Sequence, residues 1–133
     1  MIPKFRVWMK SLKWMCDVTN ISFDSKFVDI CQQGDTERYT EMSVEFDEIT
    51  LMQSTGLKDK NSQEIFEGDI VRQVRTQPIT ENETITGVVI MIEGAWLIMN
   101  DCEQLASDLW SETDENEIIG NVYENTELLE AIK

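Results

Sequence analysis

The first half of the chain alternates between apolar and polar residues with a period of two. Phe5, Val7 and Met9 share one face of an expected strand. Turn-forming residues such as Thr19 and Asn20 separate one apolar segment from the next, and no window sustains a helical period. The pattern predicts an antiparallel meander over Phe5–Met9, Trp14–Val18, Ile21–Phe23 and Phe27–Ile30, followed by an exposed connection or edge strand over Arg38–Phe46.

A turn-rich stretch in the middle of the chain separates this set of strands from a second one. Glu48–Gln53 is a compact strand candidate, and we expect it to end at Thr55-Gly56-Leu57, because glycine supplies the positive φ of a sharp reversal. Asp59–Ser62 has the side chains that turns favour. Ile65 then returns the chain to the core, and a turn at Glu67-Gly68-Asp69 feeds the next strand.

The second set of strands contains a region that is apolar on both faces. Asp69–Thr76 alternates, with Val71, Gln73 and Arg75 on one face, and a polar loop containing Pro78 follows. Thr84–Ile92 and Ala95–Met99 flank a two-residue turn, Glu93-Gly94, and both are apolar on both faces from Val88 onward. A small barrel has one interior, so the outer face needs a cover. The candidates are the N-terminal strands and a second copy of the chain.

The C-terminal part of the chain combines an acidic loop with short regular elements. We expect Leu105–Trp110 to be a helical turn or loop that presents Leu109 and Trp110 inward. Ser111–Glu117 is an acidic loop, and Glu117–Tyr123 forms a last strand in which Gly120 permits a bulge. Asn125 is a good N-cap for a helix over Thr126–Ile132. This helix is expected to dock on the rest of the protein through the apolar side chains of Leu128, Leu129 and Ile132.

The charge of the chain is strongly acidic and unevenly distributed. The 133 residues include 11 basic and 26 acidic ones and no histidine, for a net charge of −15. After Thr76 there are 13 acidic residues and one basic residue, Lys133. Such a surface repels nucleic acid and anionic membranes and favours basic partners. We therefore expect no direct nucleic-acid or membrane binding.

The three cysteines indicate a reducing compartment. Cys16, Cys31 and Cys102 are odd in number, far apart and embedded in apolar or strand-like surroundings, so we expect reduced, buried, structural thiols. The charged N-terminus is unlike a signal peptide, and no apolar run reaches transmembrane length. These features predict a cytoplasmic protein.

Two separated motifs carry a family resemblance. MQSTGLKDKNSQEIFEGDIV (Met52–Val71) and IIGNVYENTELL (Ile118–Leu129), together with the opening PKFRVW, resemble the YopX family of phage and prophage proteins. Ser62 and Thr126 stand where the family tends to have glycine and proline. The resemblance implies a mainly β protein with SH3-like barrel character, encoded by a bacteriophage or prophage, with no established enzymatic activity and no functional site to transfer.

The pattern and the resemblance together predict a mainly β fold with two subdomains. Residues 1–56 would form an N-terminal β subdomain, and residues 57–133 a small SH3-like barrel or roll with a short C-terminal helix. The motif residues have structural roles in this prediction, as turn, bulge and capping residues. They are Gly56, Leu57, Asp59, Glu67, Gly68, Asp69, Gly120, Asn121, Tyr123 and Asn125.

No group of residues in the sequence favours catalysis or metal binding. The acidic run Ser111–Glu117 lacks the glycine and distal glutamate of an EF-hand, so a solvated loop is the better interpretation. Four carboxylates could suggest acid–base chemistry, but without histidine or an oxyanion-binding group a turn-stabilising role is favoured. They are Asp59, Glu64, Glu67 and Asp69. We expect no catalytic residue, no cofactor and no metal.

The apolar and aromatic residues suggest an interaction surface instead. Trp8 and Trp14 are candidates for a surface patch, and Ile90 and Leu97 for the outward face of the two-sided hairpin, which predicts a homo-oligomer. The leading interpretation is a non-enzymatic, self-assembling accessory protein that binds a host or phage protein. One alternative is an acidic mimic of nucleic acid that blocks a DNA- or RNA-binding protein. A hydrolase or metal-dependent enzyme is a weaker alternative.

Overall fold

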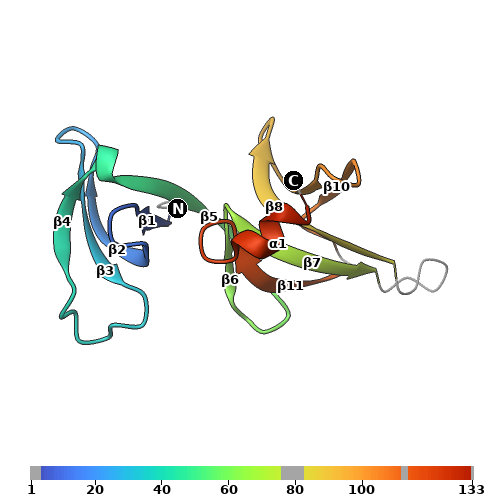
Figure 1. The fold of residues 1–133 in the computed structure, drawn as a ribbon, viewed down its shortest axis with the longest axis horizontal. Helices are drawn as coiled ribbons and strands as arrows, with labels where there is room; N and C mark the ends of the chain where they lie inside the picture. Colours follow the sequence, from blue (N-terminus) through green and yellow to red (C-terminus); the bar gives the residue numbers. More distant parts are fainter. Residues whose placement is uncertain (1–3, 76–82, 112–113, 133) are drawn as a thin grey trace. The chain divides into compact units, whose positions relative to one another are not determined.

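The computed structural model describes residues 4–75, 83–111 and 114–132, and it is mainly β (Figure 1). The expected loop around Pro78 lies almost entirely outside these residues. Two antiparallel sheets have the strand orders β4-β3-β2-β1-β5-β6 and β10-β9-β8-β7-β11. The elements are β1 (Phe5–Met9), β2 (Trp14–Ser22), β3 (Phe27–Gln32), β4 (Met42–Glu45), a 3-10 turn (Phe46–Glu48), β5 (Ile49–Lys58), β6 (Glu64–Phe66), β7 (Asp69–Arg75), β8 (Thr84–Ile92), β9 (Ala95–Asn100), β10 (Leu105–Asp108), β11 (Asp114–Asn121) and α1 (Thr126–Glu130).

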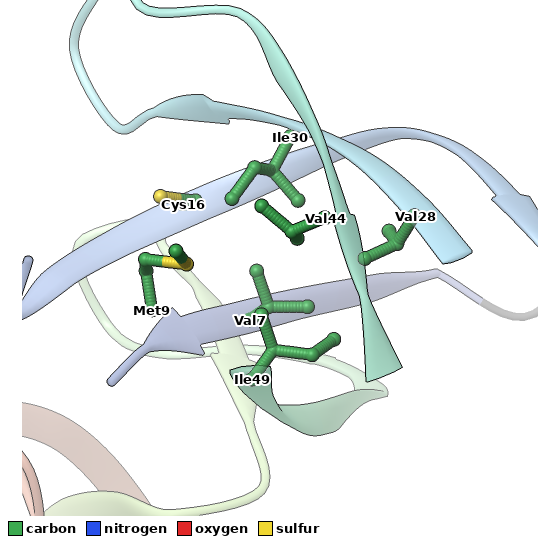
Figure 2. Packing of buried hydrophobic residues seen from close by; sticks show 7 residues of the cluster. All are labelled: Val7, Met9, Cys16, Val28, Ile30, Val44 and Ile49. Carbon is green, nitrogen blue, oxygen red and sulfur yellow. The ribbon is translucent and has the colours of Figure 1, made fainter. Parts of the chain in front are cut away.

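The chain divides into two compact units, Met1–Gln53 and Ser54–Lys133. The N-terminal unit is the expected meander, with the edge strand β4 at one side. Alternate residues of its strands point into one apolar core, as Figure 2 shows. The period-two pattern placed Val7 and Met9 on one face of their strand, but it did not single out Val44, which lies in the segment expected to be an exposed connection or edge strand. The core consists of Val7, Met9, Cys16, Val28, Ile30, Val44 and Ile49.

Two turns expected from the sequence are instead irregularities within longer strands. The residues Thr19 and Asn20 do not end β2, because the strand continues to Ser22 with a register shift at this point. Gly56 does not end β5 either. Its φ of +79° accommodates a register shift between the pairs Ser54–Phe66 and Lys58–Glu64. A glycine with positive φ fits a bulge as well as a reversal, and the sequence alone does not distinguish the two.

The core of the C-terminal unit lies against one face of the second sheet and also contains residues from outside that sheet. Three of its five buried apolar side chains come from β7, β8 and β9, one comes from β6 and one from the segment after β10, and four half-buried apolar side chains surround them. The opposite face is also buried in its centre, since Ile70 has no exposed surface although its neighbour Val71 points into the core. The sheet is therefore buried on both faces around the start of β7, although the sequence predicted a two-sided apolar region only for Val88–Ile92 and Ala95–Met99. The core residues are Ile65, Val71, Val89, Ile98 and Leu109.

A buried carboxamide, Gln73, and a half-buried one, Asn116, hold the curled C-terminal sheet together. Gln73 in β7 has no exposed surface; its amide nitrogen donates to the Asp108 carbonyl (3.0 Å) and to Asn116 Oδ1 (3.0 Å). Its amide oxygen accepts a hydrogen bond from the Ser107 hydroxyl (2.7 Å). Asn116 in β11 donates in turn to the Leu109 carbonyl (2.8 Å). These side chains link the residues at the end of β10 with both β7 and β11.

The sheet of the C-terminal unit is not a closed barrel. Among the described residues β10 and β11 form its two edges and share no backbone ladder. The link between these edges runs through the side chains of Gln73 and Asn116, so the closed SH3-like barrel that the resemblance implied is replaced by an open, curled sheet. The coarser prediction, a mainly β fold with a short C-terminal helix, is confirmed.

The segment before β11 differs from the sequence-based expectation. Leu105–Asp108 is a strand and not a helical turn, because it pairs with β9. Leu109 is fully buried as expected, but Trp110 is 61% exposed. The acidic run is also a loop only in its first part, since Asp114 onward belongs to β11. Hydrogen bonds from Gln73 and Asn116 to the carbonyls around Leu109 fix which side chain points inward.

The C-terminal helix is shorter than expected. It ends at Glu130, and Ile132 beyond it is buried, while Leu128 and Leu129 are half-buried. The main chain of this segment is attached to the β9–β10 turn, where the Cys102 N–H donates to the Ile132 carbonyl (3.3 Å). Asn125 occupies the N-cap position but makes no side-chain cap hydrogen bond.

One of the three cysteines contradicts the expectation of burial. All three thiols are free; Cys16 and Cys31 are buried, but Cys102 is exposed in the turn after β9. Burial, followed by the nearby charges of Asp17 and Cys31, raises the pKa of the Cys16 thiol to about 11. This thiol therefore stays protonated and unreactive at neutral pH.

We predict that Gln73→Leu destabilises the protein by about 2–4 kcal/mol, because it removes the hydrogen-bond partner of the Ser107 hydroxyl and of Asn116 Oδ1, which are both partly buried. Urea denaturation followed by circular dichroism measures this effect. Gln63→Leu is the matched control, since its side chain is exposed and the hydrogen bonds that it makes in the turn come from its main-chain N–H and carbonyl. Equal denaturation midpoints for the two variants would contradict the structural role of Gln73.

Candidate interaction surface

The hairpin β8–β9 is closed by a tight two-residue turn. Glu93 and Gly94 have φ angles of 50° and 83°, the pair of positive values that such turns require. Ile92 and Ala95 are directly opposite each other, followed by Met91 with Trp96 and Ile90 with Leu97. The two-residue turn predicted at Glu93-Gly94 is confirmed. We call residues 90–97 the hairpin tip.

The hairpin tip extends beyond the rest of its sheet. β7 pairs with β8 only as far as Val88, and the Gly68 N–H makes one further contact with the Val89 carbonyl (2.9 Å). Beyond this point the described residues give β8 no partner other than β9. Figure 1 shows the yellow end of β8 rising away from β7 and β11. The tip is therefore a two-stranded ribbon.

Apolar residues occupy both faces of the ribbon. On the face opposite the buried Val89 and Ile98, Ile90 and Leu97 form a half-buried cross-strand pair. The structure thus brings together the two hairpin residues that the sequence selected. Near the turn, burial decreases further: Met91 is 43% exposed and Ile92 is 40% exposed. A two-stranded ribbon cannot cover its own apolar surface, which marks the tip as a candidate contact surface.

Trp8 and Trp14 do not form a common patch. Trp14 is opposite Met9 in the β1–β2 ladder and packs against the N-terminal core, so it lies on the inner face of the sheet. Trp8 is opposite Met15 and lies on the other face. Both are half-buried. They belong to the N-terminal unit, separate from the hairpin tip.

The carboxylate of Asp59 stabilises backbone at two places. One oxygen accepts the N–H groups of Asn61 and Gln63 (both 2.9 Å), which shapes the β5–β6 turn. The other accepts the N–H of Ile118 in β11 (3.0 Å). The neighbouring Lys60 N–H donates to the Asn116 carbonyl (2.8 Å), so this turn caps the outer edge of β11. Leu57, at the same hairpin, packs against the C-terminal core.

The turn between β6 and β7 is held in a similar way. Asp69, which is 2% exposed, accepts the Phe66 N–H through its carboxylate (2.8 Å) across Glu67. Gly68 has a φ of +87°, and its carbonyl accepts the N–H of Val122 (3.0 Å). The carboxylate of Asp69 therefore stabilises the geometry of this turn.

The motif at the end of β11 fixes the path of the C-terminus. A register shift lies at Gly120, and a Cβ there would come within 2.5 Å of Asn125 Oδ1. That oxygen accepts the Asn121 N–H (3.0 Å), which explains why it does not cap the helix. The side-chain oxygen of Asn121 accepts the N–H groups of Tyr123 (3.0 Å) and Glu124 (2.8 Å). The bulge predicted at Gly120 is present.

The acidic strand β11 contains one partly buried ion-pair network. Glu117 lies 2.6 Å from Arg72 and 3.3 Å from Lys60. Hydrogen bonding by Lys60, reinforced by Arg72, lowers the pKa of the Glu117 carboxyl. Among the described residues, no three cysteine or acidic side chains are grouped so that they could hold a metal ion. No helix in the described segments is long and apolar enough to cross a membrane.

Sequence reasoning missed two features of the C-terminal unit. The sequence placed Gln73 on the same face as Val71, and a polar residue at a core position is the available signal for a buried amide network. Trp110 was expected inside but lies at the surface. No local pattern reveals this, because Leu109 and Trp110 are both apolar and compete for one buried position.

Comparisons with known proteins agree with the motifs. A model of the YopX protein family matches residues 4–130. The structure of protein EF1440 from Enterococcus faecalis is similar, with 31% identity, a TM-score of 0.60 and coverage of 97% of this chain and 99% of that one. Protein yopX from Bacillus subtilis has the same fold, at 20% identity, a TM-score of 0.58 and coverage of 94% and 96%. No curated protein matches the chain.

We predict that Glu117 makes the stability of the protein depend on pH. Because its folded-state pKa is lowered, its stabilising contribution is complete above the unfolded value of about 4.3 and is lost as the pH falls through the folded value. Glu117→Gln should therefore lower the urea midpoint at pH 7 and have little effect at pH 3. The neighbouring variant Glu115→Gln is the control. A Glu117→Gln effect of equal size at both pH values would contradict the prediction.

Proposed function

We propose that this chain, which belongs to the YopX family, is a non-enzymatic, self-associating module that binds another protein. The observation that carries the proposal is the hairpin tip, an apolar two-stranded ribbon that extends beyond its sheet. In the proposal the protein is encoded by a phage or prophage and acts in the host cytoplasm, as the family resemblance implies.

The hydrophobic effect supports a contact at the hairpin tip. Complete burial of a side chain such as isoleucine or methionine contributes about 1.5–3 kcal/mol, so covering the exposed parts of Met91 and Ile92 is favourable. Ile90 and Leu97 add half-buried surface on one side of the ribbon. A second copy is the simplest cover, because a twofold arrangement buries the same patch on both copies.

Electrostatic repulsion is the main opposing effect. Each chain carries a net charge of −15, which favours separation of two copies. Within the tip, however, the only charged residue is Glu93 in the turn. Charges further away are screened over about 8 Å at physiological ionic strength. Burial at the tip is therefore expected to outweigh the repulsion, most clearly at moderate salt.

The first test of the proposal is the mass of the protein in solution. By light scattering, the wild type should exceed the monomer mass of 15.4 kDa at micromolar concentration. Ile92→Lys, Ile90→Lys and Leu97→Lys should each shift the mass toward the monomer, with the β circular dichroism kept. Ile92 is the best position because it is 40% exposed, so the core is not disturbed.

Leu12→Lys is the matched control for this test. Leu12 is 44% exposed but lies in a turn of the N-terminal unit, so the charge should not change the mass. A wild-type protein that is monomeric at micromolar concentration would show that the self-association proposal is wrong. So would an equal loss of mass in the Leu12→Lys variant.

The alternative function, mimicry of nucleic acid, is favoured by one specific observation. The C-terminal unit contains 17 acidic and 5 basic residues, so it carries −12 of the total charge. Three of the basic side chains are already in ion pairs with carboxylates of this unit: Lys60, Arg72 and Arg75. A surface of this kind attracts proteins that normally bind phosphate backbones.

A pull-down at two salt concentrations separates the two functions. A partner held by mimicry should be lost steeply between about 50 and 300 mM salt, because its binding is electrostatic. A partner held at the hairpin tip should remain at the higher salt and be lost with Ile92→Lys. Retention of the partner at high salt by both the wild type and Ile92→Lys would contradict both functions.

A further inference from the structure

A surface hollow of about 450 Å³ lies within the C-terminal unit, beside the outer edge of β11. One wall is formed by the end of β5 and the start of the β5–β6 turn, and the other by the residues that follow β10 and by the start of β11. Its volume falls in the range typical of binding sites, about 300–1,000 Å³. The residues that matter for its chemistry are Leu57, Lys58, Lys60, Trp110, Asp114 and Glu115.

The two walls of the hollow are fixed to each other by hydrogen bonds. The Lys60 N–H donates to the Asn116 carbonyl (2.8 Å), and the Ile118 N–H donates to the Asp59 carboxylate (3.0 Å). Asn116 also donates to the Leu109 carbonyl (2.8 Å), directly before Trp110. The hollow is therefore formed before any ligand arrives, which reduces the entropic cost of binding.

An exposed aromatic ring stands at this hollow. Trp110 is 61% exposed, although its neighbour Leu109 is fully buried. Tryptophan provides a large apolar surface and a negative ring face, and it is enriched among the residues that dominate binding energies. A ligand group that is flat, apolar on its faces and positively charged would use both properties.

The charges around the hollow also favour a cation. Its lining and the adjacent Glu117 present four carboxylates against two ammonium groups. The Lys60 ammonium is already compensated by Glu117, at 3.3 Å. Three acidic residues line the hollow: the Asp59 carboxylate is buried by its backbone hydrogen bonds, and the other two are Asp114 and Glu115. The unit as a whole carries −12, which adds to the attraction.

We propose that this hollow binds an arginine side chain from an exposed segment of a basic partner protein. The planar guanidinium group stacks on Trp110 and pairs with the carboxylate of Glu115, which suits arginine better than lysine. The inference extends the proposed protein-binding role to a second surface. It does not depend on self-association, because the hairpin tip and the hollow share no residue.

A peptide titration of the full-length protein tests the inference. The probe is acetyl-Gly-Arg-Gly-amide, with the citrulline peptide as a neutral analogue of the same shape. Binding is followed by NMR through the backbone amide of Asn116 and the indole N–H of Trp110. We expect millimolar affinity for the arginine peptide, about tenfold weaker binding of the citrulline peptide, and a loss of about fivefold or more in Trp110→Ala.

Charge controls distinguish a specific site from general attraction. Glu115→Gln should weaken binding about threefold or more, whereas Glu127→Gln removes one charge from α1 and should leave it unchanged. Equal binding of the arginine and citrulline peptides, or equal effects of Glu115→Gln and Glu127→Gln, would overturn the inference. Repeating the titration with Ile92→Lys keeps the two proposals separate. The arginine site should persist in that variant whether or not the wild type self-associates.

Discussion

The buried carboxamide of Gln73 holds the C-terminal unit in its curled form. It lies in the middle of β7 with no exposed surface, and both ends of its amide group are used: the nitrogen donates toward Asp108 and Asn116, and the oxygen accepts from Ser107. An amide can donate and accept at once, which an apolar core residue cannot do. Because a buried polar group without a partner costs about 1–3 kcal/mol, the arrangement has few alternatives of similar energy.

Side chains replace backbone ladders at several other positions in this unit. Asp59 caps the edge of β11, Asp69 completes the β6–β7 turn, and Asn125 accepts the Asn121 N–H at the bulge. These residues form the motif that identifies the family, and their carboxylate and amide oxygens face backbone N–H groups. Their acidic character therefore has a structural explanation. This finding directs attention away from proton-transfer chemistry and toward surfaces that the hydrogen-bond network leaves exposed.

The two proposed contact surfaces both lie where the backbone and side-chain hydrogen bonds of the C-terminal unit stop. β7 stops pairing with β8 at Val88, so the apolar tip continues alone beyond it. At the other side of the unit, the hydrogen bonds that bury Leu109 leave Trp110 at the surface, next to the turn held by Asp59. An apolar ribbon and a negatively charged aromatic hollow suit different partners. One chain can thus combine a contact between copies with a contact to a basic protein.

The sequence by itself determined where most strands lie and which face of each is buried. Period-two alternation located Val7 and Met9 in one core, the β8–β9 hairpin and its Glu93-Gly94 turn, and the bulge at Gly120. Alternation is a local property of an extended chain, and turn residues act over a few positions, so both can be recognised without a fold.

The tertiary structure decided the features that depend on contacts between distant parts of the chain. Gly56 became a bulge because β6 pairs across it, and Leu109 took the buried position because Gln73 and Asn116 bind the adjacent carbonyls. The tip is exposed because β7 is shorter than β8, and the pairing of strands distant in sequence depends on contacts that no local pattern contains.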